Sequence, residues 1–142
     1  MSIIYWLAGG ILLAIAWADT TRHQIPALFV ALLICCGIVR AFWRGGWPEM
    51  FMGLLLCGLP ILLVSISLQK GFIGGGDIKL CAALGAFLGP IDALLVISAA
   101  LICLSVFGLA KHAENRRIPF APFVFPIYVV YMTCIFTLKG LS

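Results

Sequence analysis

Charged residues are scarce in this 142-residue chain. They make up only 10% of the sequence, whereas an ordinary soluble domain has about 25%. Hydrophobic residues make up 64% of the chain, and a water-soluble fold could not cover so much apolar surface. The scarcity of charge therefore excludes an ordinary soluble domain. Because the apolar runs extend from end to end, we expect residues 1–142 to form a single transmembrane domain.

Motifs of most catalytic and metal sites are also missing. The sequence has no CxxC pair and no HExxH, GxSxG or Walker motif. His23 and His112 have no partner at metal-ligand spacing. Free thiols within apolar runs behave as small hydrophobic side chains, and this is what we expect of all six cysteines: Cys35, Cys36, Cys57, Cys81, Cys103 and Cys134. These absences disfavour serine and metalloprotease chemistry, and we expect no metal and no cofactor.

Long apolar runs are what the sequence has instead. A membrane-crossing helix needs roughly 20 apolar residues, with about 17–25 tolerated. Five runs qualify, at residues 3–18, 27–43, 50–68, 91–110 and 118–138. Residues 78–89 form a shorter run, which spans only about 18 Å as a helix. We therefore expect an all-α membrane bundle of about six transmembrane helices with a short fourth helix. The first run has no basic residue before it and no cleavage site after it, so we expect it to be retained and not removed as a signal peptide.

The net charge of +4 is better explained by membrane topology than by nucleic-acid binding, because the basic residues are scattered over short loops. When the short run is counted as the fourth of six, the odd-numbered loops are those after the first, third and fifth runs. They contain Arg22, Lys70, Lys79, Lys111, Arg116 and Arg117. The other side has Arg40, Arg44 and Lys139. The positive-inside rule places the odd-numbered loops in the cytoplasm. Asp19 directly follows the first run, and Asp77 directly precedes the short fourth run at residues 78–89. Both are therefore expected at the cytoplasmic boundary of the membrane.

The chain has five acidic residues, and their positions in the sequence predict different roles. Glu49 and Glu114 stand in polar loops beside basic residues, which predicts solvated surface positions. Asp92 stands near the start of a helix, where a carboxylate is favoured by the helix dipole, so we expect it to cap that helix. Asp19 and Asp77 adjoin apolar runs. An ionisable group at membrane depth is a functional candidate, although an interfacial carboxylate can also be a simple helix cap.

As a pair, Asp19 and Asp77 have well-defined chemistry. Two close carboxylates share a proton, so one can activate water while the other protonates an amide. That is peptide hydrolysis without a metal or a covalent nucleophile. The glycine run at residues 74–76 gives the backbone freedom beside Asp77. Lys79 is expected to anchor a helix end at the interface, with a catalytic role as the less favoured alternative.

The segment Gly74-Gly75-Gly76-Asp77-Ile78-Lys79-Leu80 resembles the GxGDxKL signature of type IV prepilin leader peptidases, the bacterial relatives of archaeal preflagellin peptidases. Asp19, followed by Ile25 and Pro26, is similar to the first aspartate element of that family. Residues 82–89 resemble its glycine-spaced fourth helix, and residues 117–122, which include Pro119, resemble its IPFGP element. These pieces occur in the expected order over most of the chain.

The resemblance implies a six-helix membrane enzyme in which Asp19 and Asp77 are the catalytic pair. It also implies loop-shaping or substrate-binding roles for Gly74, Gly75, Gly76, Lys79, Ile25, Pro26 and Pro119. The expected activity is removal of a short basic leader from pilin-like precursors at the cytoplasmic face of the bacterial inner membrane. Two positions depart from the family pattern: Ala27 replaces its asparagine and Ala121 replaces the glycine of IPFGP.

Larger family members have a cytoplasmic insertion with paired CxxC motifs and also N-methylate the new pilin terminus. The short, cysteine-free loop after the first run predicts neither zinc nor methyl transfer. This short form is similar to the peptidases of Flp or Tad-type pilus systems. Two alternatives stay open: a small transporter or proton relay that uses membrane carboxylates, and a catalytically inactive scaffold of pilus assembly. The sequence assigns neither the acid and base roles of the two aspartates nor an oligomeric state.

Overall fold

The computed structural model describes residues 2–22, 25–67, 75–110 and 120–140. This part of the chain contains helices and no strands, which confirms the predicted all-α bundle. The six helices are α1 (Ser2–Arg22), α2 (Ala27–Arg44), α3 (Trp47–Ser67), α4 (Gly75–Leu88), α5 (Pro90–Ala110) and α6 (Ala121–Gly140).

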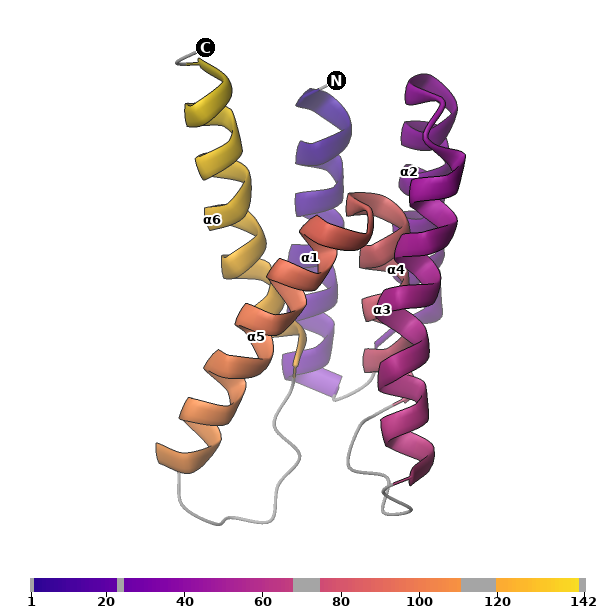
Figure 1. The fold of residues 1–142 in the computed structure, drawn as a ribbon. Coiled ribbons are helices and arrows are strands. Elements are labelled where there is room, and N and C mark those ends of the chain that lie inside the picture. The colour runs from indigo at the N-terminus through magenta and orange to yellow at the C-terminus, as the bar shows by residue number, and fades with distance from the viewer. Residues whose placement is uncertain (1, 23–24, 68–74, 111–119, 141–142) are drawn as a thin grey trace.

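Successive helices run in opposite directions, so both chain termini lie at the same end of the bundle (Figure 1). We call this the upper end. At the lower end, α1 ends and α4 begins. The short connections between helices favour this up-and-down arrangement. It places the end of α1 and the start of α4 at the same end of the bundle, as the order of the predicted runs implied.

Glycine and proline set the helix boundaries at the upper end. α2 ends at Gly45, which has a left-handed φ of 67° that an L side chain rarely adopts. Gly89, with φ 92°, separates α4 from α5, and Pro90 begins α5. The third helix starts at Trp47, earlier than the predicted residue 50. Pro48 is accommodated there because a proline in the first turn of a helix breaks no intrahelical hydrogen bond.

α4 is the central helix of the bundle, and its second half is buried from Leu80 to Leu88 apart from Ala82. Small residues let its backbone approach α2 and α3. A Cβ atom at Gly53 of α3 would lie 2.7 Å from the carbonyl carbon of Gly85. A Cβ atom at Gly37 of α2 would lie 2.9 Å from the Ala86 oxygen. Close backbone contact through small residues is typical of packing between membrane helices.

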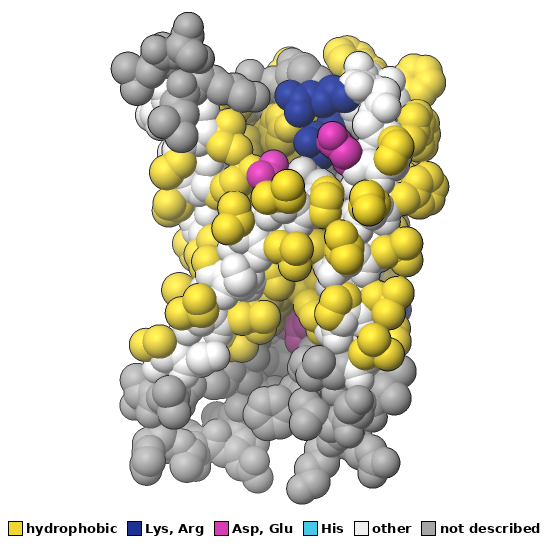
Figure 2. Space-filling view, viewed as in Figure 1, with side chains coloured by type: hydrophobic (Ala, Val, Ile, Leu, Met, Phe, Trp, Pro, Cys, Tyr) yellow, Lys and Arg dark blue, Asp and Glu magenta, His cyan; other side chains and the backbone are white. Residues whose placement is uncertain are grey.

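Apolar side chains cover much of the visible outer surface (Figure 2). Within the described residues, two helical segments are long and apolar enough to cross a membrane, Ile3–Thr21 and Ala27–Arg44. The corresponding apolar stretches of α3, α5 and α6 are shorter: Trp47–Leu63, Pro90–Val106 and Ala121–Thr137. α4 has only 14 residues and is therefore about 21 Å long, which agrees with the prediction of a short fourth helix.

Candidate active site

Asp19 lies in the last turn of α1 and is buried, with 6% of its surface exposed. Its Oδ2 atom accepts a hydrogen bond of 3.2 Å from the backbone N–H of Ala121, the first residue of α6. The first N–H groups of a helix have no partner within the helix, and this end of the helix dipole is positive. The start of α6 therefore holds the Asp19 carboxyl group in a defined place.

Asp77 lies in the first turn of α4 and is partly buried. Since α1 ends and α4 begins at the lower end (Figure 1), the structure places Asp19 and Asp77 at the same end of the bundle. Both side chains take part in interactions with their surroundings. Figure 2 shows acidic atoms near this end, set back behind the apolar side chains in front. The predicted pair therefore shares one end of the molecule.

The segment that follows α1 packs against the start of α4. A Cβ atom at Gly76 would lie 3.0 Å from the Cβ atom of Ile25, so a larger residue at position 76 would press on Ile25. Pro26 has an extended backbone and directly precedes α2. The structure thus brings together two predicted motif segments that are distant in the sequence, one after Asp19 and the other before Asp77.

The remaining predicted residues are less constrained. A Cβ atom at Gly75 would meet nothing within 4 Å, and the Lys79 side chain is exposed. Gly74 and Pro119 lie outside the described residues, as do Glu114, His23 and His112. In the described ranges, no three His, Cys, Asp or Glu side chains gather as metal ligands would.

Asp92 and Glu49 lie away from the candidate site. Asp92 is in the first turn of α5, and its carboxyl group faces the Tyr131 hydroxyl of α6. Glu49 is exposed in the first turn of α3. α3 starts at the upper end, and α5 starts in the upper half of the bundle, below the upper ends of its neighbours (Figure 1). The interaction of Asp92 with Tyr131 joins α5 to α6, a contact that the prediction of a helix cap did not include.

Sequence reasoning missed two partners. The amide of Ala121 was not expected to hold Asp19, although the family-like segment at residues 117–122 marked the region. Arg40 was assigned to topology alone, whereas its Nη1 group donates a hydrogen bond to the Phe87 carbonyl oxygen inside the bundle. The available signal was an arginine close to the end of an apolar run, since such residues are rare at membrane depth and seldom lack a partner.

Comparison with known proteins points to a peptidase family. The model of the type IV leader peptidase family matches residues 6–109, a stretch that contains both Asp19 and Asp77. The prepilin leader peptidase/N-methyltransferase of Legionella pneumophila is 33% identical over 118 residues, which is 80% of this chain and 36% of that protein. The chain thus spans about a third of the length of this curated relative. No solved structure matches the chain. The family match over most of the sequence shows that this protein belongs to the type IV leader peptidase family.

Proposed function

We propose that this protein is a membrane aspartic endopeptidase that removes the short basic leader of type IV prepilins, with Asp19 and Asp77 as its catalytic pair. The observation that carries the proposal is the position of the two aspartates, one in α1 and one in α4, at the same end of the bundle. Family membership supports the substrate class, because the relative from Legionella pneumophila is described as a prepilin leader peptidase.

The proposed reaction is a general acid–base hydrolysis. One carboxylate takes a proton from water, whose oxygen attacks the scissile carbonyl carbon. The other carboxyl group gives a proton to the amide nitrogen, the C–N bond breaks, and the new amine leaves. Asp19 is well placed for this work because the Ala121 amide fixes its orientation, and fixed geometry lowers the entropic part of the barrier.

The surface supports a bundle embedded in the bilayer, with the lower end facing the cytoplasm. Trp6, Trp17, Trp43 and Trp47 are all exposed. Trp17 stands near the lower end of α1, and the other three stand near the upper end. Tryptophan at both levels is typical of the two membrane interfaces. The excess of basic residues in the odd-numbered loops supports a cytoplasmic position for the lower end, where the aspartates lie. A basic leader would reach the site from there.

The substrate class that we propose is a small Flp-like prepilin, and the proposed reaction ends with hydrolysis. α1 ends at Arg22 and α2 begins at Ala27, so only residues 23–26 connect them. A connection of this length cannot contain the cysteine-paired insertion of the larger enzymes. We therefore propose a peptidase domain that needs neither zinc nor a methyl donor.

The experiment reconstitutes the protein in liposomes with a Flp-like pilin precursor and measures the mass of the pilin. The variants are Asp19→Asn and Asp77→Asn, and Glu49→Gln is the control because Glu49 is exposed at the opposite end. We expect leader-sized mass loss with the wild type and with Glu49→Gln. We expect at least about 100-fold slower cleavage in each aspartate variant, because each removes an acid–base group. Cleavage retained by both variants would refute the assignment.

A further inference from the structure

The upper end of α4 is buried, which creates a need for hydrogen-bond donors. The last four carbonyl groups of a helix lack partners within the helix. In α4 these belong to buried residues 85–88. The Gly85 oxygen accepts a bond of 2.9 Å from the N–H of Gly89. An unpaired carbonyl group away from water is costly, so the other carbonyl groups at this end need donors from elsewhere.

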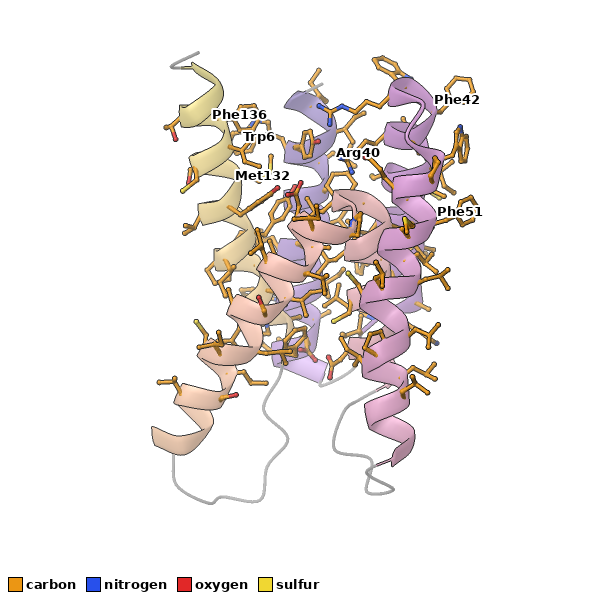
Figure 3. All side chains as sticks on the ribbon, in the orientation of Figure 1. Trp6, Arg40, Phe42, Phe51, Met132 and Phe136 are labelled. Atoms are coloured by element: carbon orange, nitrogen blue, oxygen red, sulfur yellow. The ribbon has the colours of Figure 1, made fainter. Side chains whose placement is uncertain are left out.

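Arg40 of α2 provides such a donor. Its Nη1 group donates a hydrogen bond to the Phe87 oxygen, and the side chain lies among the helices in the upper part of the bundle (Figure 3). A positive charge is favoured at the C-terminal end of a helix dipole. Gly37, one turn earlier in α2, makes the approach possible, because a Cβ atom there would meet the Ala86 oxygen at 2.9 Å.

The same contacts join α4 to α1, the helix of Asp19. The Arg40 guanidinium carbon is 6.0 Å from the centre of the Tyr5 ring. The Tyr5 ring meets the Phe87 ring edge-on, with centres 5.4 Å apart. α6 also contacts Tyr5, because the Tyr128 hydroxyl donates a hydrogen bond of 2.9 Å to the backbone carbonyl oxygen of Tyr5. Arg40, Tyr5 and Phe87 therefore form a contact between α1, α2 and α4, which we call the upper clamp.

We propose that Arg40 is a positioning residue of the peptidase: by capping the buried end of α4, it sets where Asp77 stands relative to Asp19. The inference rests on the proposed function. Phe87 and Asp77 are ten residues apart in one continuous helix, about 15 Å along its axis. A shift at the capped end is therefore passed on to Asp77. Tyr5 is on the same helix as Asp19, so the upper clamp fixes the two helices that bear the aspartates.

The kinetic test compares Arg40→Gln, Arg40→Lys and the matched control Arg44→Gln in liposomes with the pilin precursor. Arg44 lies one turn further along α2 and is exposed. We expect Arg40→Gln to lower kcat about 10- to 100-fold with little change in KM, because a displacement of about 1 Å can cost that much. Arg40→Lys is expected to restore part of kcat, since it keeps the charge but not the planar fork. Equal kcat values for Arg40→Gln and Arg44→Gln would overturn the proposal.

A second measurement does not depend on activity. Hydrogen–deuterium exchange read by mass spectrometry is compared for peptides from α4 and from α3. We expect Arg40→Gln to raise exchange in α4 at least about threefold and to leave α3 unchanged, as local opening requires. Unchanged α4 exchange, or an equal rise in every helix, would overturn the positioning role.

If Arg40→Gln does not fold, Arg40→Lys decides: lowered kcat with normal α3 exchange supports the role, and wild-type kcat overturns it. A wild-type protein that cleaves no prepilin would refute the proposed function, while the exchange data would still test the upper clamp.

Discussion

The crossing of α3 and α4 offers the sharpest test of the packing, through the substitution Gly53→Ala. The added Cβ atom would lie 2.7 Å from the carbonyl carbon of Gly85 and 3.1 Å from that of Gly89, and the Gly85 oxygen is nearer still. Carbon atoms in favourable contact are about 3.5–4.0 Å apart. The two backbones must therefore separate by roughly 1 Å, because no side chain at the contact can rotate away.

Two effects follow from this separation. Overpacking of a well-packed interior costs about 1–3 kcal/mol, and the better helix propensity of alanine returns at most about 1 kcal/mol. We expect a net loss of about 1–2 kcal/mol in the free energy of unfolding. Because α4 bears Asp77, a shift of about 1 Å is also expected to slow prepilin cleavage by up to about 100-fold.

The assay measures unfolding by SDS titration in mixed micelles, followed by circular dichroism, together with the cleavage rate in liposomes. Gly10→Ala is the matched control, because Gly10 is an exposed position in α1 and its added Cβ atom would meet nothing within 4 Å. We expect this control to be as stable as the wild type or more so. If Gly53→Ala is as stable as Gly10→Ala and cleaves at the wild-type rate, the close backbone contact between α3 and α4 is wrong.

Four further outcomes are expected in the same assays. Ala121→Pro removes the amide that bonds Asp19 and is expected to slow cleavage at least about 10-fold, whereas Ala121→Gly keeps the amide and most of the activity. Tyr128→Phe removes the hydroxyl that bonds the Tyr5 oxygen and is expected to lower the free energy of unfolding by about 1 kcal/mol. Lys79→Gln changes an exposed side chain, so cleavage is expected to stay within about threefold of the wild type. EDTA is expected to leave the cleavage rate unchanged, and an EDTA-sensitive rate would contradict a mechanism based on two carboxylates alone.

Much of the fold could be predicted from the sequence because apolar runs of membrane length have few alternatives to the helix. The runs at residues 3–18 and 27–43 predicted α1 and α2 closely, and the short run at 78–89 predicted a short fourth helix. The start of α3 was placed too late, at residue 50, because the apolar run begins only after Pro48 and Glu49, which the first turn of the helix accommodates. Family-like motifs predicted the candidate site residues.

The sequence alone also determined that Asp19 and Asp77 share one end of the bundle. Each helix reverses the chain direction, so the end of the first and the start of the fourth must meet at the same face. The sequence did not determine which side chains touch. The bond between Asp19 and Ala121 joins residues 102 positions apart, and the bond between Arg40 and Phe87 spans 47 positions. Such contacts depend on the rotation and tilt of each helix. Continuous apolar runs do not reveal the rotation and tilt of a helix. Only the tertiary structure decided them, through the packing of small residues of one helix against the backbone of another.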